Sequence, residues 1–440
     1  MKRFISLALS LFVCHHTATA GIPIQHWTLD NGAKVYLVEV PGLPMVDMQV
    51  ELDAGSRRDG NFNGLSSATA SMMAKGVKAV GAQAAMDENA LGEAWADLGA
   101  QVNASSSSDR MSLSLRSLTR PELLDAAVAL AARQLAHPSF PNAIWQNERE
   151  RWVASIKEAN TKPATVASRA YNKALFGDHP YGAEVDEASL RRIDTTLMAK
   201  FHADHFKPCM AKVSIVGALN RAQAQERVAQ LLAHLPVEAS CPVLPTLPEV
   251  KPLAQAQTLQ IPFESAQAHV FIGQVGIARE HPDYLALTVG NYVLGGGGFV
   301  SRLTEQVREK RGLSYSVYSY FGAWQQAGPF TVGLQTRPDQ AQQAVKVATD
   351  VVADFVKTGP TDKELKAAKD FMIGGFALRL DSNRKLMDNL SNIAWYELPL
   401  DYLDTWTAQV DKLTTKDIQQ AFARNLQPER MVTVILGAQP

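Results

Sequence analysis

The sequence has no excess of charge of either sign. Its 43 lysine and arginine residues and 44 aspartate and glutamate residues give a formal net charge of −1. A chain this close to neutral lacks the basic surface with which proteins bind nucleic acid or an anionic membrane. Charged residues make up 20% and hydrophobic residues 46% of the 440 residues, which is typical of a folded globular protein, and the length predicts two or more domains.

The sequence also has no hydrophobic run long enough to cross a membrane, which would need about 20 residues. The apolar stretch Ile5–Val13 is about half that length. It follows Lys2 and Arg3 and precedes Ala18-Thr19-Ala20, which has the A-x-A pattern of a cleavage site. This arrangement predicts a signal peptide at residues 1–20 and a protein that is exported, either to the periplasm or out of the cell.

Cysteine is scarce, with three residues in all, and Cys14 lies within the predicted signal peptide. The mature chain keeps Cys209 and Cys241. An oxidising compartment permits a disulfide between these two residues. The sequence does not show whether their Cα atoms come within bridging distance, so a disulfide and two free, buried thiols both remain open.

The second half of the chain repeats the first at an offset of 220 residues. The stretch from Ile193, IDTTLMAKFHADHFKPCMAKVSIVGA, matches without a gap the stretch from Leu413, LTTKDIQQAFARNLQPERMVTVILGA. Both copies have the pattern of an amphipathic helix, a proline that ends it, and a β-branched strand that closes on Gly-Ala. The repeat predicts a duplicated chain. The identical pairs are Thr195/Thr415, Ala203/Ala423, Pro208/Pro428, Ile215/Ile435, Gly217/Gly437 and Ala218/Ala438.

Each half is predicted to be an α+β domain in which a mixed β-sheet is covered by helices. The first domain is expected at residues 21–235 and the second at residues 256–440. Residues 236–255 between them are rich in proline and have the composition of a linker. The prolines are Pro236, Pro242, Pro245, Pro248 and Pro252.

Residues 64–76 of the first half read GLSSATASMMAKG. This stretch resembles the pitrilysin/insulinase family of metallopeptidases, whose inverted zinc motif has the form G-L-x-H-x-x-E-H-M-x-x-K-G. In that motif two histidines on one helix face bind zinc, and the glutamate acts as general base on the bound water. The matching positions here are Ser67, Ala70 and Ser71, which carry neither an imidazole nor a carboxylate.

The family's third zinc ligand is a glutamate on a later helix, about seven residues after an E-R pair. The pair Glu148-Arg149 is present, but Ser155 occupies the position of the ligand. All four functional positions thus have small, neutral side chains, whereas the flanking Gly64, Lys75 and other motif residues remain. A catalytic zinc site needs three protein ligands of nitrogen, sulfur or carboxylate type. The resemblance therefore implies a non-catalytic member that holds no zinc of its own.

The second half keeps more of the family's pattern. Four glycines, Gly295, Gly296, Gly297 and Gly298, have exposed amides that could approach a substrate chain, although composition alone equally fits a flexible joint. Arg308 and Tyr315 follow at a spacing of seven. In the family, an arginine and a tyrosine with this spacing reach the zinc site across a closed chamber, hold the substrate carbonyl and stabilise the oxyanion.

Two alternatives for these residues stay open. Arg308 could be a solvated charge on a helix, and Tyr315 could be packed on the sheet as part of a predicted strand, Ser314–Phe321. In a strand, Tyr315 and Phe321 would share a face with Val317 and Ser319. If this strand lies at a sheet edge, it could also take a peptide by β-augmentation.

The resemblance covers nearly the whole mature chain and implies two homologous domains that form half of a clamshell-like chamber. Some members, such as mitochondrial processing peptidase and bacterial heterodimers, divide the work between two chains. We therefore expect the non-catalytic, substrate-binding subunit of an exported zinc-dependent peptidase. Its partner would be a homologous subunit that carries the zinc, and its substrate a peptide. The alternative is a peptide-binding or structural scaffold of the same fold with no role in catalysis.

Three further features have weaker functional interpretations. His202 and His205 form an H-x-x-H pair, but no third metal ligand accompanies it. The serines at 105–108 could supply a nucleophile, but they lack a nucleophile elbow. His179, in the turn-forming run Asp178–Gly182, is expected to be structural.

Overall fold

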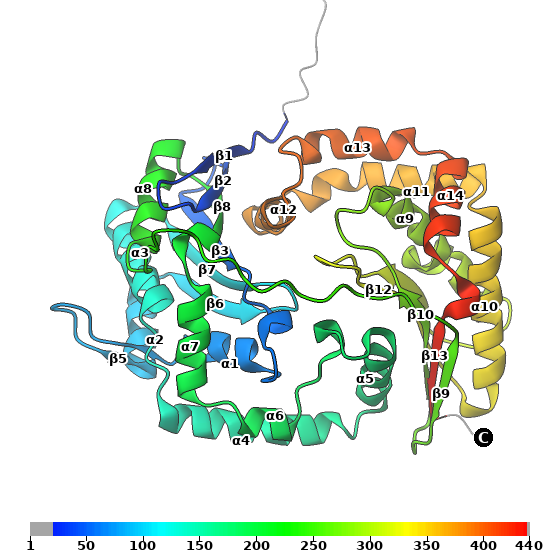
Figure 1. Cartoon of the computed structure of the whole chain (residues 1–440). Coiled ribbons are helices and arrows are strands. Elements are labelled where there is room, and N and C mark those ends of the chain that lie inside the picture. The colour runs from blue at the N-terminus through cyan, green and yellow to red at the C-terminus, as the bar shows by residue number, and fades with distance from the viewer. Residues whose placement is uncertain (1–20, 438–440) are drawn as a thin grey trace, which may run out of the picture.

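A computed structural model describes residues 21–437, so the predicted signal peptide lies outside the described residues. Two β-sheets face one another across the molecule, each with helices on its outer side (Figure 1). Within residues 21–437, no helix combines the length and hydrophobicity that a membrane crossing requires.

The two sheets have the same topology, which confirms the prediction of two homologous α+β domains. The first sheet has the order β1-β2-β8-β3-β7-β6, and the second, read in the matching direction, has the order β9-β13-β10-β12-β11. In each sheet one neighbouring pair is parallel, β2 with β8 and β9 with β13, and the other pairs are antiparallel. Strand β1 is an addition to the first sheet. The bounds are β1 (Gln25–Thr28), β2 (Lys34–Glu39), β3 (Met45–Leu52), β6 (Gln101–Ser106), β7 (Met111–Leu118), β8 (Lys212–Gly217), β9 (Gln257–Ile261), β10 (Ala268–Val275), β11 (Val317–Phe321), β12 (Pro329–Thr336) and β13 (Val432–Leu436).

The sequence repeat appears again in the helices. Helix α7 (Thr195–His205) and helix α14 (Thr415–Asn425) begin and end at positions that differ by the same offset of 220. Each is capped one residue earlier: the Asp194 carboxylate accepts from Leu197 N at 2.8 Å, and the Thr414 hydroxyl accepts from Asp417 N at 3.2 Å. These caps satisfy backbone donors that the first turn of a helix leaves unpaired.

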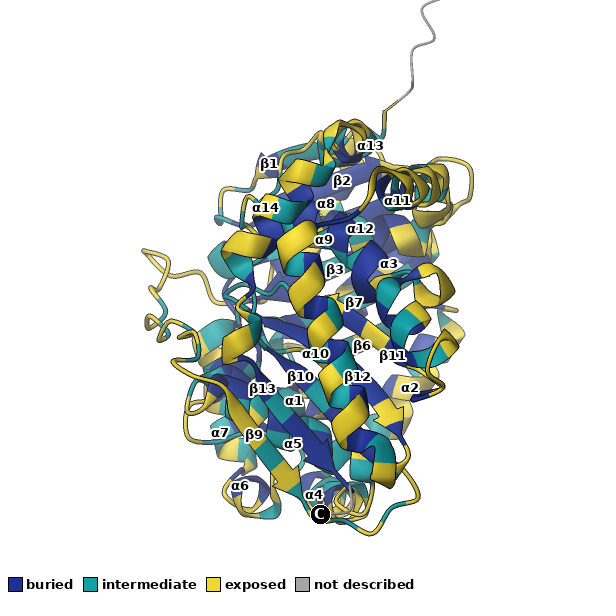
Figure 2. Ribbon diagram, turned by 90° about the vertical axis from the view of Figure 1, so that its right-hand side faces the viewer, coloured by how far each residue is buried: buried dark blue, intermediate teal, exposed yellow. Residues whose placement is uncertain are grey.

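Helices cover the outer face of each sheet and close the two main cores. In β7 the residues Met111, Leu113 and Leu115 are buried toward the helices, whereas the alternate residues Ser114 and Arg116 point to the opposite, polar face. Figure 2 shows the buried strands of the second sheet behind α10, whose outer face is exposed. The covering helices include α1 (Leu65–Met72), α3 (Pro121–Ala136) and α8 (Arg221–Leu232) on the first sheet, and α9 (Tyr284–Asn291), α10 (Ala341–Thr358) and α14 on the second.

The halves exchange one helix each. Helix α5 (Pro163–Phe176) of the first half packs on β10 and β13 of the second sheet, and helix α12 (Asn383–Trp395) of the second half packs on β8 and β3 of the first (Figure 1). The two helices start 220 residues apart. The buried Tyr171 hydroxyl of α5 donates to Phe330 O at 2.9 Å. Because each sheet is covered by a helix from the other half, the exchange holds the two halves together.

A second connection between the halves centres on the buried Asp109, in the turn between β6 and β7. One of its oxygens accepts from the Tyr181 hydroxyl at 2.5 Å, and the other accepts from Gln325 N at 3.0 Å. The Arg57 guanidinium lies 3.5 Å from the same carboxylate. A buried carboxylate is stable only with such partners, so Asp109 holds the first half to the loop between β11 and β12.

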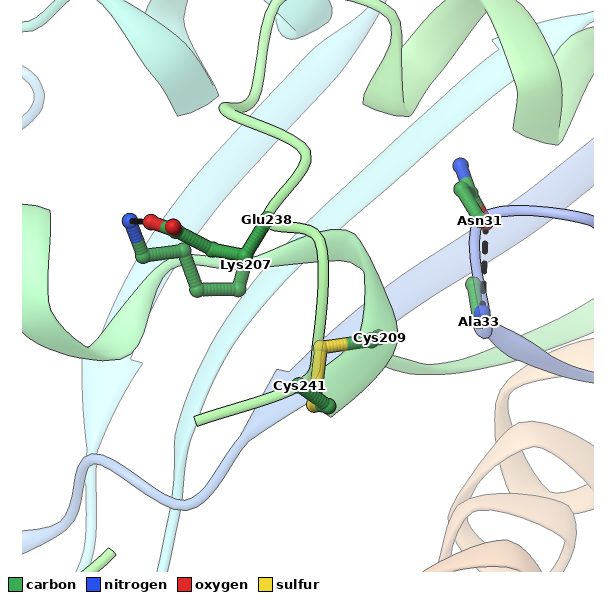
Figure 3. The surroundings of a disulfide bond; sticks show 6 residues. All are labelled: Asn31, Ala33, Lys207, Cys209, Glu238 and Cys241. Atoms are coloured by element: carbon green, nitrogen blue, oxygen red, sulfur yellow. Dashed lines mark hydrogen bonds and ion pairs between the residues drawn. A yellow bond between two sulfur atoms is a disulfide. The ribbon is translucent and has the colours of Figure 1, made fainter. Parts of the chain in front are cut away.

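The segment between α8 and β9 contains no helix or strand, and the domain limits placed within it remain a prediction. A disulfide joins Cys209 to Cys241, which decides between the two alternatives that the sequence left open (Figure 3). Beside it, Lys207 Nζ lies 2.5 Å from Glu238 Oε1. Further along the segment, Pro248 O lies 3.0 Å from the ring nitrogen Nε2 of His179 in the first half. The segment is therefore fastened to the first half at several points.

Candidate functional site

Helix α1 keeps the local structure of a zinc helix without the ligands. Its start is held by the buried Asp59, whose carboxylate accepts from Gly64 N at 2.7 Å and from Ser66 N at 2.8 Å. Burial raises the pKa of Asp59 to about 6. Gly64 has φ 99, a left-handed conformation that favours glycine.

The three replaced positions on α1 lie at different depths, and none offers a strong metal ligand. Ser67 is half-buried, Ala70 is buried and Ser71 is exposed. Ser155 is exposed on helix α4 (Asn142–Ala159). Among residues 21–437, no group of three or more histidine, cysteine, aspartate or glutamate side chains could hold a metal ion. Hydroxyl and methyl groups do not bind catalytic zinc, so the residues at this position do not fit the metal.

Two motif residues that the sequence retains connect α1 to its neighbours. Lys75, just after α1, lies 3.1 Å from Glu148 of α4 and 2.7 Å from Glu88 at the start of α2 (Glu88–Asp97). Lys75 and Glu148 are two of the motif residues that the sequence retains. They keep the end of α1 connected to α4.

The glycine run follows directly on α9. The helix ends at Asn291 and continues as a wider π-type turn over Tyr292–Gly296. Asn291 is the reason for this arrangement, because its side chain donates to Ser319 O at 2.9 Å and accepts from the Ser319 hydroxyl at 2.6 Å. The glycines are therefore held against β11 at this point.

Gly295 and Gly298 serve different purposes in the run. A Cβ atom on Gly295 would lie 2.7 Å from Ser319 N, so only glycine allows the chain to pass this close to β11. Gly298 has φ +59 and open space around it, which brings Phe299 to the surface. The run is thus a close approach to the sheet followed by a sharp turn.

Arg308 and Tyr315 lie together, and a third residue joins them. The guanidinium carbon of Arg308 is 4.7 Å from the ring centroid of Tyr315 and also 4.7 Å from that of Phe299. Tyr315 is 81% exposed and Phe299 is 72% exposed, so the group projects from the surface. Stacking between two rings orients the guanidinium. We call Phe299, Arg308 and Tyr315 the arginine stack.

Phe299 was not predicted from the sequence. The signal that could have identified it is an aromatic residue directly after four glycines, where no strand or helix pattern would bury it. Arg308 also lies 3.2 Å from Glu309 on its own helical turn. Arg308 thus has a charged neighbour on its helix, as expected if it were a solvated helix charge. Its guanidinium is nevertheless stacked on two rings and does not extend freely into water.

The predicted strand Ser314–Phe321 begins too early. The strand starts at Val317, and Tyr315 lies in a bend before it with its ring exposed, so Tyr315 is not packed on the sheet. The Ser314 hydroxyl lies 2.6 Å from both Ser316 O and Gln335 O, and these contacts bend the chain before the ladder begins. Val317 and Ser319 share a buried face, as alternation predicts.

Strand β11 lies at the edge of the second sheet, because β12 is its one neighbour in the sheet order. Tyr318 and Tyr320 point away from the buried face, and their ring centroids are 6.2 Å apart. Strand β6 is at the corresponding edge of the first sheet. Both halves thus present an edge strand to which an extended peptide could pair.

A polar cavity beside β6 was also not predicted from the sequence. It has a volume of about 530 Å³ and lies between the polar face of the first sheet and helix α12. Arg116 and Asp47 form an ion pair on its wall at 2.6 Å. The sequence feature that could have predicted it is in β3, where Asp47, Gln49 and Glu51 alternate with apolar residues and give the strand one polar face.

The histidine pair on α7 takes part in packing. His202 Nε2 lies 2.7 Å from Leu135 O, and burial lowers the pKa of His202 to about 4. His205 Nδ1 lies 2.9 Å from Phe201 O. In each ring one nitrogen thus lies within hydrogen-bond distance of a backbone carbonyl. The His205 ring stacks on Phe201, and the His202 ring stacks on Phe206.

The serine run likewise bonds to its own surroundings. Ser105 Oγ lies 3.0 Å from Ser112 Oγ on the neighbouring strand, and Ser107 donates to Arg110 O at 3.1 Å. None of the hydrogen bonds of these serines within residues 21–437 reaches a histidine. The arrangement does not activate a hydroxyl as a nucleophile.

Comparison with known proteins identifies the family. Residues 34–189 match the insulinase family (peptidase family M16), and residues 192–372 match the peptidase M16 inactive domain. A crystal structure of a peptidase M16 inactive domain from Pseudomonas fluorescens is 34% identical over 95% of this chain and 98% of that chain, with a TM-score of 0.89. The chain belongs to the insulinase family of peptidases.

Two relatives with opposite descriptions are nearly equally similar to this insulinase-family chain. YmxG of Bacillus subtilis, named an uncharacterized zinc protease, is 27% identical over 84% of this chain and 88% of its own length. YmxG of Helicobacter pylori, named a non-peptidase homolog, is 25% identical over 95% of this chain and 94% of its own length. Overall identity to these two relatives therefore does not decide whether this chain is a peptidase. At Ser67, Ala70, Ser71 and Ser155 this chain lacks the ligands and the general base of the family's zinc motif.

Proposed function

We propose that this protein is the non-catalytic, substrate-binding subunit of an exported zinc-dependent peptidase. The observation that carries the proposal is the exposed arginine stack, Phe299, Arg308 and Tyr315, in a chain whose own zinc positions cannot bind metal. In this family the arginine and tyrosine serve a zinc site in the opposing domain. Here the residues that would serve such a site remain while the site is missing, which favours a site on another chain.

The partner would be a homologous subunit with an intact zinc helix, and the two chains together would enclose a chamber for peptides. Zinc on that partner would polarise the scissile carbonyl and activate the attacking water. From this chain, the Arg308 guanidinium and the Tyr315 hydroxyl would donate hydrogen bonds to the carbonyl oxygen as it gains negative charge. Of the four glycines, Gly295 is buried against β11, so the exposed Gly296 and Gly298, together with the edge of β11, would hold the substrate backbone.

Export is supported by the pattern of residues 1–20 and by the disulfide between Cys209 and Cys241, since structural disulfides persist in oxidising compartments. A periplasmic or secreted location fits both observations. Zinc would enter the complex with the partner subunit alone.

The proposal is tested by peptide hydrolysis with the co-expressed complex of this chain and its zinc-bearing partner. Removing one donor to an oxyanion lowers kcat by about 100-fold or more, and we expect this for Arg308→Ala and for Tyr315→Phe. Arg337→Ala is the matched control, because Arg337 is an exposed arginine of the same half that pairs with its neighbour Asp339. Unchanged turnover in both site variants, with the complex still formed, would reduce the protein to a scaffold.

A further inference from the structure

A second pocket in the C-terminal half has no role in the proposed mechanism. It has a volume of about 280 Å³ and lies between α9, α12, the short turn Phe376–Arg379 and helix α13 (Tyr402–Lys412). Arg279 and Arg379 contribute its two charged side chains, and no aspartate or glutamate lines it. Within residues 21–437, neither arginine forms an ion pair with a carboxylate.

Arg279 is held in place by aromatic side chains. Its guanidinium carbon lies 3.8 Å from the ring centroid of Tyr284 and 5.4 Å from that of Tyr402, and its Nη2 donates to the Tyr402 hydroxyl at 2.9 Å. Asp109, which lies near Tyr396 on this wall, is already bonded to Tyr181 and Gln325. A half-buried guanidinium with further N–H donors is thus oriented in advance but has no anionic partner.

Arg379 also lines this pocket. It is exposed, and its guanidinium carbon lies 5.4 Å from the ring centroid of Trp406. Two guanidinium groups that face one cavity without a carboxylate make its interior positive, and arginine binds carboxylates through paired hydrogen bonds. The ligand that fits this charge is a carboxylate.

The remaining walls are apolar and include Phe376, Ile393 and Trp406. Pockets for drug-sized ligands have volumes of about 300–1,000 Å³, so this one suits a single residue-sized group. Such a ligand would combine a carboxylate with one apolar side chain. That description fits the C-terminal residue of a peptide, and it also fits a small free carboxylic acid.

The position of the pocket favours the peptide. Tyr315 lies two residues before the edge strand β11, and the pocket-lining Ala323 lies two residues after it. At about 3.3 Å per residue, the eight residue steps from Tyr315 to Ala323 span roughly 26 Å at most along this edge. A peptide of about eight residues would reach from one to the other.

We infer that the pocket between Arg279 and Arg379 binds the C-terminal carboxylate and apolar last side chain of the peptide substrate. The inference rests on the proposed function, because that function supplies a peptide as ligand. It adds a specificity: substrates with a free, apolar C-terminus would bind better than internal segments of a longer chain.

The test is isothermal titration calorimetry on the purified mature chain without its partner. The probes are two ten-residue peptides that end in leucine and differ only in a C-terminal acid or amide, and N-acetyl-leucine represents a small free acid. We expect the acid peptide to bind at least about tenfold more tightly than the amide. Arg379→Gln should abolish that preference, as should Arg279→Gln, with Arg279→Lys retaining part of it, whereas Arg337→Gln should keep it in full.

Equal binding of the acid and amide peptides, or the same preference in Arg379→Gln, would overturn the inference. Because Arg379 is exposed, its variant should keep the wild-type unfolding temperature, and this is measured alongside. Binding of N-acetyl-leucine alone would overturn the peptide assignment and leave a pocket for small acids. Since this test needs neither the partner nor turnover, its failure would leave the role of Arg308 untouched.

Discussion

At the scale of single residues, the arginine stack distinguishes Arg308 from an ordinary surface charge, because its guanidinium contacts two aromatic rings in addition to Glu309. Two rings, Phe299 and Tyr315, flank its guanidinium at equal distances. A cation–π contact at an exposed site contributes about 0.5–1 kcal/mol. The stack therefore orients Arg308 modestly, and the guanidinium itself supplies the chemistry.

This difference predicts a graded response to mutation. Phe299→Ala should lower turnover by the co-expressed complex only about two- to fivefold, since it removes one cation–π contact and leaves both donors in place. Val300→Ala, the next exposed residue, is the control and should have no effect. A loss in Phe299→Ala as large as in Arg308→Ala would show that the ring contacts the substrate directly.

Glu51 is a second residue whose environment has a measurable consequence. It is fully buried in β3, and burial raises its pKa to about 7, although Arg110 lies 2.7 Å away and Lys212 is near. The folded protein therefore holds a proton that the unfolded chain has already released above about pH 4.5. Stability should fall as the pH rises from about 4.5 to 7, because folding then requires either this proton or a buried charge.

Urea unfolding at pH 5 and pH 8 checks this prediction. The fall in unfolding free energy between the two should be smaller in Glu51→Gln than in the wild type, by an amount on the order of 3 kcal/mol at most. Asp59, whose pKa burial raises to about 6, contributes in the same direction and is unchanged in the variant. Glu226→Gln, an exposed replacement, should retain the full pH dependence. An identical fall in wild type and Glu51→Gln would refute the assignment.

At the scale of helices and strands, the exchange of α5 and α12 joins the two halves. The Tyr171 hydroxyl is buried under the second sheet and bonds to Phe330 O and to the Thr331 hydroxyl. Tyr171→Phe should lower the free energy of unfolding by about 1–2 kcal/mol, because it leaves buried acceptors without a donor. Chemical denaturation measures the change. Tyr320→Phe, on the exposed side of β11, is the matched control and should change nothing.

The sequence was informative at this scale where a pattern is local. The repeat fixed the correspondence of α7 with α14 and of β8 with β13, because caps, a proline and β-branched residues mark their limits. It could not show which sheet α5 and α12 cover, since an apolar helix face does not specify its partner. The end of α9 at Asn291 and the late start of β11 at Val317 depend on side-chain contacts between distant residues, which no periodicity reveals.

The candidate site divides in the same way. The replaced zinc positions could be identified from the sequence because a motif with fixed spacing surrounds them. They are Ser67, Ala70, Ser71 and Ser155. The pairing of Arg308 with Tyr315 followed from the same kind of spacing. Phe299 and the pocket at Arg279 were not predicted, because their groups come from segments that meet only in the folded chain.

At the scale of the whole molecule, the disulfide fastens the connection between the halves to the first half. Cys209 and Cys241 are separated by 32 residues, and closing a loop of this size stabilises the folded state by about 3–4 kcal/mol. Cys209→Ser should lower the midpoint of thermal unfolding by several degrees under oxidising conditions. With a reductant present, wild type and variant should have the same midpoint of thermal unfolding. A difference that persists under reducing conditions would show that the Cys209 side chain stabilises the fold without the disulfide.

The whole-molecule account is that one active site is divided between two chains, with zinc on the partner and the arginine stack here. The most direct test adds this purified chain to the purified zinc-bearing subunit and follows peptide hydrolysis. Wild-type chain should produce activity that neither subunit has alone, and the double variant Arg308→Ala/Tyr315→Phe should form the same complex with turnover reduced by about 100-fold or more. Equal activity with the double variant and the wild type would contradict the account.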